Sequence, residues 1–556
     1  MCTGTARPAA VYLPIARNMQ CKKITISGEI ELTESKNGAT ALIETLADCG
    51  VEYCIANPGT SEMHLVQALD RVPRIKSVLA LFEGVCTGAA DGIGRMTGKP
   101  AATLLHLGPG LANGIANLHN ARRANSPMIN IVGNHPNYHV GYDAPLTSNI
   151  DTLAANYSNW TKSCSTAQSL AQDGADAYTA TLRQSSGANG QIATLIMGAD
   201  AAWGDSNGPA SPNPIPQRSK IDEATVEALA QVFTSGGKIA MLLEHHATEQ
   251  TAMEAGSKIA KKTGSTLFNA TFPGRVDGGP GRVAVKRLPY FPEQILEALD
   301  GFDHLVLVNA EIPASFFAYQ GMPSQLVPEG CQVHRFTQKE DDASDALQRL
   351  AERLGAGKEE VSRFEKIEVS EPAGELKTKI ILQSIAATLP EEVIVCTDSG
   401  GGNSAYPFCQ TAATNSWLSL TGGAIGQGGP CATGAALACQ DRPVLALLGD
   451  GGAAYTIQSL WTQAREGLNV TTVIFANNVY NILTNEYAKI GVDNPGAIAQ
   501  SLFDISNPIM DWVGMANSFG VPAAKAETGE ELCRLLKQSF RTPGPFLIQA
   551  SGQLQR

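Results

Sequence analysis

The stretch Val444-Leu445-Ala446-Leu447-Leu448-Gly449-Asp450-Gly451 is an apolar run that ends in an acidic residue between two glycines. A second apolar run, 473–476, ends in Asn477-Asn478. Short apolar runs of this kind predict buried strands, and α/β proteins bind ligands at the carboxyl ends of such strands. The two runs therefore predict a carboxylate and an amide oxygen at one edge of a sheet.

These groups suit a metal-bound diphosphate. Gly449, Gly451 and Gly452 allow close approach of the backbone, and one helix is expected between the two strands, with its N-terminal N–H groups facing the same crevice. Mg²⁺ binds few protein oxygens and completes its octahedron with phosphate oxygens. Asp450, one asparagine and a backbone carbonyl would supply enough protein ligands for such an ion.

The stretch from Gly449 to Trp461 resembles the cofactor motif of thiamine diphosphate (ThDP) enzymes, and most of all the benzoylformate decarboxylase branch. The resemblance implies that Asp450, Asn478 and the Tyr480 carbonyl hold Mg²⁺. The family places its asparagine one residue closer to the Asp than Asn478 lies here, so Asn477 is an open alternative. The resemblance covers about residues 37–556.

The composition sets broad limits. A chain of 556 residues predicts three or four domains at roughly 150 residues each. The net charge of −12 argues against a nucleic-acid or anionic-membrane partner, and no apolar run is long enough to span a bilayer. Twelve scattered cysteines without a Cys-x-x-Cys pair favour reduced thiols and the cytoplasm. The basic, acid-free residues 1–28 leave an organellar transit peptide as the alternative.

Two stretches divide the chain into three pieces: 204–220 is rich in proline, and 355–375 is charged and contains glycine and proline. Each piece alternates short apolar runs with helical periods. This pattern predicts an α/β protein with three domains, each built on a mostly parallel sheet flanked by helices. The family order of pyrimidine-binding, central and diphosphate-binding domains fits it. The predicted segments are an N-terminal extension 1–35, a pyrimidine-binding domain 36–203, a linker 204–220, a central Rossmann-like domain 221–354, a linker 355–375 and a diphosphate-binding domain 376–556.

Two motifs near the N-terminus carry candidate catalytic groups. Glu83 ends an apolar run and opens Glu-x-x-x-x-Gly-Ala-Ala-Asp-Gly; a carboxylic acid among apolar residues can share its proton with a ring nitrogen. The family uses its Glu in this pattern to activate the aminopyrimidine ring of ThDP. His106 precedes a Gly-Pro-Gly loop, where benzoylformate decarboxylase also has a histidine that moves protons to and from the substrate.

The turn Asn57-Pro58-Gly59-Thr60-Ser61-Glu62 follows an apolar run and precedes a helical stretch. By itself it is a strand-to-helix turn with a hydroxyl cap. It resembles the turn that lines the active site of benzoylformate decarboxylase, so Asn57 and Pro58 are assigned to the cofactor. Thr60 takes the place of the serine that contacts substrate.

Two further segments are assigned to the cofactor. Ile425, beside Gly423, lies 25 residues before Asp450, where the family has the bulky residue that bends ThDP. Ser399, Gly400 and Gly401 follow an apolar run and can surround the diphosphate with backbone N–H groups.

The central segment gives less information. Arg275, Arg282 and Arg287 surround a glycine-rich stretch that is expected to be a flexible loop. Acetolactate synthases hold FAD in this domain, but no motif of this sequence supports FAD.

Together these features predict a ThDP- and Mg²⁺-dependent lyase that decarboxylates a 2-oxo acid and can ligate the product to a second carbonyl. The alternatives are an acetolactate-synthase-like transferase, with FAD as an option, and a 2-hydroxyacyl lyase. The family shares each active site between two subunits, so a homodimer or homotetramer is expected.

Overall fold

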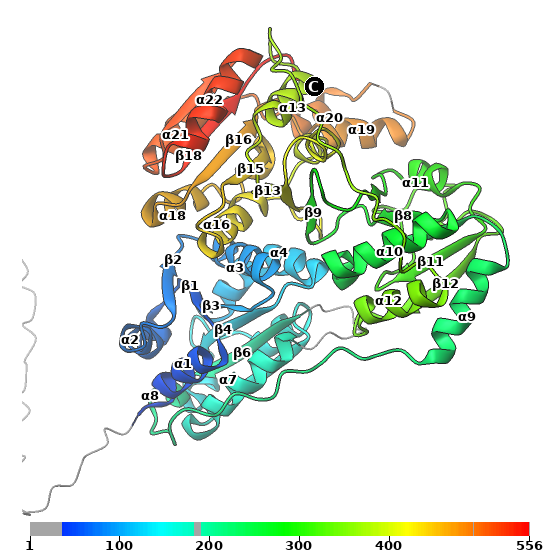
Figure 1. The fold of residues 1–556 in the computed structure, drawn as a ribbon. Helices are drawn as coiled ribbons and strands as arrows, with labels where there is room; N and C mark the ends of the chain where they lie inside the picture. The colour runs from blue at the N-terminus through cyan, green and yellow to red at the C-terminus, as the bar shows by residue number, and fades with distance from the viewer. Residues whose placement is uncertain (1–35, 183–190, 493, 555–556) are drawn as a thin grey trace, which may run out of the picture. The chain divides into compact units, whose positions relative to one another are not determined.

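The computed structural model describes residues 36–182, 191–492 and 494–554. The predicted extension 1–35, and with it the transit-peptide alternative, lies outside the described residues. Within the described ranges the chain forms three sheets of six, five and seven strands, each flanked by helices (Figure 1). The predicted α/β architecture with mostly parallel sheets is confirmed. No helix in these ranges has the length and apolar character needed to cross a membrane.

The first sheet has the strand order β2-β1-β3-β4-β6-β5, and every neighbouring pair is parallel. Its strands are β1 (Tyr53–Asn57), β2 (Lys76–Leu79), β3 (Ala101–Leu105), β4 (Met128–Asn134), β5 (Trp160–Cys164) and β6 (Ile192–Gly198). Its helices are α1 (Gly38–Cys49), the 3₁₀ turn η1 (Thr60–Glu62), α2 (Met63–Arg71), α3 (Glu83–Thr97), α4 (Leu107–Ala124), α5 (Asn137–Val140), α6 (Ile150–Ala155), α7 (Ala167–Leu182) and α8 (Ala199–Trp203).

The second sheet has the order β10-β8-β7-β11-β12, again parallel throughout. Its strands are β7 (Ile239–Leu243), β8 (Thr266–Asn269), β10 (Lys286–Arg287), β11 (His304–Val308) and β12 (Gln332–Thr337). Its helices are α9 (Glu223–Thr234), the 3₁₀ turn η2 (His245–Thr248), α10 (Gln250–Thr263), α11 (Pro292–Leu299) and α12 (Ala343–Arg353).

The third sheet has the order β17-β18-β16-β15-β13-β14-β9. Its strands are β9 (Val276–Gly278), β13 (Val393–Thr397), β14 (Asn415–Leu418), β15 (Val444–Gly449), β16 (Val470–Phe475), β17 (Ala523–Ala526) and β18 (Phe546–Ala550). Its helices are α13 (Thr378–Thr388), α14 (Gly400–Asn403), α15 (Tyr406–Cys409), α16 (Gly428–Ala438), α17 (Asp450–Ala453), α18 (Ser459–Glu466), α19 (Asn481–Lys489), α20 (Ala497–Phe503), α21 (Trp512–Ser518) and α22 (Gly529–Arg541).

Two local expectations were wrong. The glycine-rich segment expected to be a flexible loop contains β9, which pairs antiparallel with β14, and Arg275 holds Asp277 of this strand at 2.9 Å. The single helix expected between β15 and β16 is divided into α17 and α18. The interruption coincides with Thr456, whose hydroxyl donates to the Gly426 carbonyl at 2.7 Å and holds the chain there.

The first and third sheets share one apolar core, which runs through α3 and α16 and is made largely of alanine, leucine and isoleucine side chains. The two helices approach each other at the level of the backbone. A Cβ at Gly92 would lie 2.1 Å from the Cys431 carbonyl oxygen, and one at Gly434 would lie 1.8 Å from that of Ala89. Only glycine fits at these contacts. The contact brings the N-terminal end of α3 close to the loop that precedes α16.

Candidate active site

Asp450 lies at the carboxyl end of β15, beside the end of its parallel neighbour β16. The residue is 2% exposed. Its Oδ2 accepts the backbone N–H of Asn478 at 2.6 Å, and its Oδ1 accepts that of Gly451 at 2.9 Å. Burial raises the pKa of Asp450, while the backbone donors act in the opposite direction. A cation bound here would compete directly with the proton on this carboxylate.

The two asparagines that follow β16 differ in their contacts. The Asn477 side-chain oxygen accepts the Val479 N–H at 3.3 Å, whereas Asn478 has a positive φ of 57° and no hydrogen bond within the described residues holds its side chain. The Tyr480 carbonyl accepts the Leu483 N–H at 2.9 Å, which leaves its second lone pair for another partner. Asn478 is therefore the better candidate for an oxygen ligand beside Asp450.

Around Asp450, glycines leave the backbone without side chains that would cover it. A Cβ at Gly451 would lie 2.2 Å from the Tyr480 ring, and one at Gly449 would lie 3.1 Å from Ser399 Cβ. Ser399 begins α14, and its hydroxyl accepts the Gly402 N–H at 2.9 Å. Because these positions are glycines, the backbone of the short turns α14 and α17 is not covered by side chains next to Asp450.

Asp398, the residue before Ser399, is a site residue that the sequence analysis did not assign. It is 2% exposed; its Oδ2 accepts the Gly428 N–H at 3.3 Å, and its Oδ1 has no hydrogen-bond partner. Burial raises the pKa of Asp398 to about 6. A Cβ at Gly452 would lie 3.3 Å from its carboxylate oxygens. An orphaned buried carboxylate oxygen thus lies against the backbone that follows Asp450.

Glu83 is the first residue of α3 and is buried. The Asn113 side-chain amide donates to its Oε2 at 3.0 Å, and no cation pairs with it among the described residues. A Cβ at Gly110 would lie 3.2 Å from Glu83 Oε1 and 3.4 Å from His106 Cβ. The Glu83 carboxylate and the Cβ of His106 therefore both lie next to the same glycine, and Asn113 is a further polar group that the sequence pattern did not reveal.

The turn after β1 places a buried acid, Glu62, and the hydroxyl of Ser61 beside His106. Glu62 is fully buried; its Oε2 lies 2.8 Å from His106 Nδ1 and accepts the Gly59 N–H at 2.7 Å. Ser61 Oγ donates to Glu62 Oε1 at 2.8 Å and lies 3.3 Å from His106 Nδ1. Thr60, assigned to substrate from the sequence, is exposed, and its hydroxyl makes no hydrogen bond to another described residue. Because Glu62 occupies Nδ1, the Nε2 atom of His106 is left for other partners.

Asn57 and Pro58, assigned to the cofactor from the sequence, begin this turn, and their cofactor role stays a prediction. The Asn57 side chain donates to the Ala80 carbonyl at 3.0 Å, which ties the end of β1 to the segment before Glu83. Pro58 follows it and is partly buried. The signal for Glu62 was present in the sequence as an acid three residues after a turn glycine, a capping-box pattern.

The loop 421–427, which carries Ile425, lies along α4. The Asn117 side chain donates to the Gly84 carbonyl at 2.8 Å and reaches the Gly426 carbonyl at 3.5 Å. The Asn120 side chain donates to the Ala424 carbonyl at 2.8 Å. Ile425 is partly buried, and Gly423 has a φ of 76° that favours glycine. The residue that follows Glu83 and the loop that carries Ile425 thus meet within one chain.

A buried ion pair in α3 helps to hold the first and third sheets together. Arg95 Nη2 lies 2.6 Å from Asp91 Oδ2, and both side chains are almost fully buried. Arg95 also donates to the Ser419 carbonyl at 2.6 Å and to Gln427 at 3.3 Å. Asp91 belongs to the Glu83 motif, so that motif carries both a candidate catalytic acid and the anchor between the first and third sheets.

The residues fit a diphosphate held through a divalent cation. One buried carboxylate, one unbonded amide and a carbonyl oxygen surround an edge where glycines expose backbone N–H groups. In the described part of the chain no group of three or more His, Cys, Asp or Glu side chains forms a metal cage. The cation would therefore depend on phosphate oxygens for the rest of its coordination.

Family comparisons agree with this geometry. Residues 36–155 match the thiamine pyrophosphate enzyme N-terminal TPP-binding domain, and residues 400–550 match the C-terminal TPP-binding domain. IlvX of Mycobacterium tuberculosis, which carries a provisional name as an acetolactate synthase large subunit, is 48% identical over 515 residues. The alignment covers 92% of this chain and 98% of that protein. The chain belongs to the thiamine diphosphate enzymes, in the acetolactate synthase and benzoylformate decarboxylase family.

Other relatives point to both branches. The chain is 26% identical to benzoylformate decarboxylase of Pseudomonas aeruginosa, over 92% of this chain and 98% of that protein. The solved structure of a ThDP-dependent 4-hydroxybenzoylformate decarboxylase from Rhodococcus jostii superposes with a TM-score of 0.80 at 21% identity. It covers 93% of this chain and 99% of that chain, and it supports the fold. The predicted family and fold are thus confirmed, whereas the roles of the individual residues stay predictions.

Proposed function

We propose that this ThDP enzyme requires Mg²⁺ and decarboxylates a 2-oxo acid. The observation that supports the proposal is that Glu83 and His106 both lie next to Gly110, with Glu62 holding Nδ1 of the histidine. Decarboxylation followed by release of an aldehyde needs a group that delivers a proton to the product. An imidazole oriented by a buried carboxylate suits that task.

The other residues take supporting roles in the proposal. Asp450, Asn478 and the Tyr480 carbonyl would hold Mg²⁺, and the turns at Ser399 and Gly449 would bind the diphosphate. When bound, ThDP supplies the carbanion that adds to the keto carbon and accepts the electrons released with CO₂. Glu83 would exchange a proton with the pyrimidine ring nitrogen.

Contact with Ile425 would fix the conformation of ThDP. A fixed conformation holds the atoms that exchange a proton close together, which makes the transfer efficient. His106 Nε2 would give a proton to the product carbon or take one from the product hydroxyl. The Asn113 amide holds the Glu83 carboxylate in place for its own proton transfer.

The second candidate is an acetolactate-synthase-like transferase. The 48% identity to IlvX favours it, because that relative is named for this activity. The two candidates differ in the fate of the product of CO₂ loss. A decarboxylase protonates it, whereas a transferase joins it to a second carbonyl. The His106–Glu62 pair is the feature of this chain that favours protonation.

The deciding experiment is CO₂ release by the pure protein with ThDP and Mg²⁺ from a panel of 2-oxo acids, pyruvate to benzoylformate, with products identified by NMR. We expect an aldehyde from one branched or aromatic acid. Acetolactate from pyruvate, together with bound FAD in the absorption spectrum, would establish the transferase instead. Activity confined to 2-hydroxyacyl thioesters would make the protein a lyase of that class.

A further inference from the structure

The helix that follows the candidate metal ligands, α19, has little apolar anchorage of its own. It begins directly after Tyr480, and the Tyr480 carbonyl accepts the Leu483 N–H at 2.9 Å, so the first turn of α19 sets the direction of this carbonyl. Among their described residues, neither α19 nor α20 contains a buried side chain. The ring contact between Tyr487 and Phe503 joins the two helices only to each other. The position of α19 therefore depends on contacts outside this segment.

Those contacts come from α11 of the second sheet, which lies beside α19 (Figure 1), and from the loop after β11. Lys489 is the last residue of α19. Its ammonium lies 3.8 Å from the centre of the Phe291 ring and 4.4 Å from that of Tyr319, and 3.2 Å from Glu293 Oε1. The Lys489 side chain is only 23% exposed. Two ring faces and a carboxylate thus surround one cation, and each attracts it.

Tyr319 contacts α19 a second time. Its hydroxyl donates to both carboxylate oxygens of Glu486, at 3.1 and 3.0 Å. Desolvation and the bond to Glu486 raise the pKa of Tyr319, so the hydroxyl keeps the proton that it donates. Glu486 and Lys489 are three residues apart and face the same side of the helix. The Tyr319 ring therefore holds α19 at two neighbouring points.

The groups that hold Lys489 are themselves well supported. Phe291 is the N-cap residue of α11, and its ring packs edge-on against Tyr290 with 4.9 Å between ring centres. Tyr290 in turn packs against Phe316, with 5.6 Å between ring centres. A Cβ at Gly423 would lie 2.4 Å from the Phe316 ring. The same aromatic cluster thus contacts the loop 421–427 and the helix that follows the metal ligands.

We propose that Lys489 is a positioning residue for the metal site. Held between Phe291 and Tyr319, it keeps α19 in the place from which the Tyr480 carbonyl is available to Mg²⁺. This inference rests on the proposed role of Asp450 and Tyr480 in binding Mg²⁺. Without Lys489, α19 has to be ordered at the moment the metal binds, and the conformational freedom that it loses then lowers the apparent affinity.

The test measures ThDP binding by the cofactor-free, full-length protein in a calorimeter over a series of Mg²⁺ concentrations. Lys489→Met removes the charge and keeps the length of the side chain, so it should raise the Mg²⁺ concentration for half-maximal binding roughly tenfold. Lys489→Arg keeps a cation between the rings and should stay within about threefold of wild type. Tyr319→Phe removes only the bond to Glu486 and should have a smaller effect in the same direction as Lys489→Met.

Lys525→Met is the matched control. It removes a surface lysine of β17, on the same sheet as Asp450, whose ion pair with Glu527 at 2.6 Å lies at that sheet edge. Its Mg²⁺ requirement should equal that of wild type. Thermal unfolding of the cofactor-free Lys489 variants should also match wild type, because α19 has no buried residue.

Asp450→Asn separates this inference from the metal assignment on which it rests, since it should abolish Mg²⁺-dependent ThDP binding in the same assay. An unchanged Mg²⁺ requirement in Lys489→Met, beside lost binding by Asp450→Asn, would overturn the role of Lys489 alone. Equal losses in Lys489→Met and Lys489→Arg would also overturn it, because a cation between the rings would then have no effect. Normal binding by Asp450→Asn would overturn the metal assignment and this inference together.

Discussion

At the scale of single residues, Glu62 connects the turn after β1 to His106, the candidate proton-transfer residue. It is fully buried and touches His106, Ser61 and the Gly59 N–H at once. The family resemblance directed attention to Thr60, which takes the place of a serine that contacts substrate, whereas in this chain Glu62 is the buried residue of the turn that contacts His106. The direction of each side chain in this tight turn depends on how η1 folds against β4, which no local pattern specifies.

Glu62→Gln tests this reading. Glutamine keeps the volume but removes the charge that holds the Nδ1 proton of His106, so the ring loses its preferred tautomer. We expect kcat for the 2-oxo acid to fall roughly 10- to 100-fold with little change in KM. Ser61→Ala is the control, since it removes the 2.8 Å bond to Glu62 Oε1 and the 3.3 Å contact to His106 but leaves the Glu62 carboxylate in place, and it should retain most of the activity. Equal activity of Glu62→Gln and wild type would show that the carboxylate serves packing alone.

Asp398 predicts a pH dependence of stability. Its pKa rises from 3.8 to about 6 in the folded protein, so the folded state keeps the proton that the unfolded chain has already released. The cofactor-free protein therefore loses stability as pH rises from about 4 to about 6, by about 3 kcal/mol from this group. Asp398→Asn should be more stable than wild type by that order at pH 7, and the difference should vanish near pH 4.

Urea unfolding of both cofactor-free proteins at pH 4, 5, 6 and 7 measures this difference. Other groups titrate in the same range, but they are common to both proteins and cancel in the comparison. A constant difference across the series would mean that Asp398 is ionised in both the folded and the unfolded states.

At the scale of elements, the sequence predicts strands better than connections. The runs at 128–132, 304–308 and 444–448 became β4, β11 and β15 with small changes at the ends, because fully buried parallel strands are continuous apolar segments. β9 was missed because three residues are too few for a pattern and its partner, β14, lies far along the chain. Long-range pairing of this kind is a property of the fold.

The contact between α3 and α16 yields a prediction about packing. Gly434→Ala places a methyl group 1.8 Å from the Ala89 carbonyl oxygen, where backbone must move to relieve the clash. We expect a loss of stability of about 1–3 kcal/mol or more, measured by urea unfolding, and a loss of ThDP affinity because the two domains shift apart. Gly141→Ala is the control, since that position has a φ of −65° and open space around its Cβ, and it should leave both quantities unchanged.

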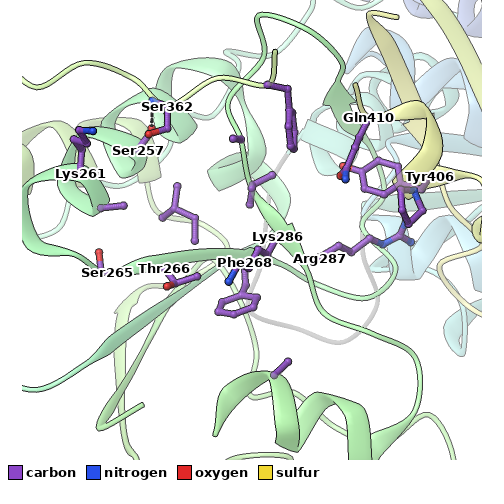
Figure 2. A pocket seen from close by; sticks show the side chains of 17 residues that line it. Ser257, Lys261, Ser265, Thr266, Phe268, Lys286, Arg287, Ser362, Tyr406 and Gln410 are labelled. Atoms are coloured by element: carbon purple, nitrogen blue, oxygen red, sulfur yellow. Dashed lines mark hydrogen bonds between the residues drawn. The ribbon is translucent and has the colours of Figure 1, made fainter. Parts of the chain in front are cut away.

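At the scale of the whole molecule, the candidate site is assembled from distant parts of the chain. Asp450 with Asn478 could be found as a pair, because both follow strands in one motif. The cavity that Phe268, Arg287 and Tyr406 line (Figure 2) could not be found from the sequence, because its walls come from segments more than a hundred residues apart. Recognition of a site from sequence works where its residues share a strand edge and fails where a surface forms only by domain packing.

The remaining question at this scale is which chains complete one active site. The described chain brings α3 and the loop of Ile425 together by itself. However, apolar side chains near both halves of the site are exposed: Leu81, two residues before Glu83, is 44% exposed, and Ile498 and Leu502 of α20, after the metal asparagine, are 80% and 69% exposed. Apolar surface in these places favours a second copy of the chain, so we expect a homodimer or homotetramer that shares its sites.

Mixing two inactive variants tests this expectation. Glu83→Gln removes the acid of α3, and Asp450→Asn removes the metal carboxylate, so each protein alone should lose nearly all activity. If each site takes Glu83 from one subunit and Asp450 from the other, a mixed dimer contains one site with both mutations and one intact site. Random re-pairing after unfolding and refolding together should then restore about a quarter of wild-type activity. Refolding each variant alone is the control, and a mixture that stays inactive while forming mixed dimers would show that each chain supplies a complete site of its own.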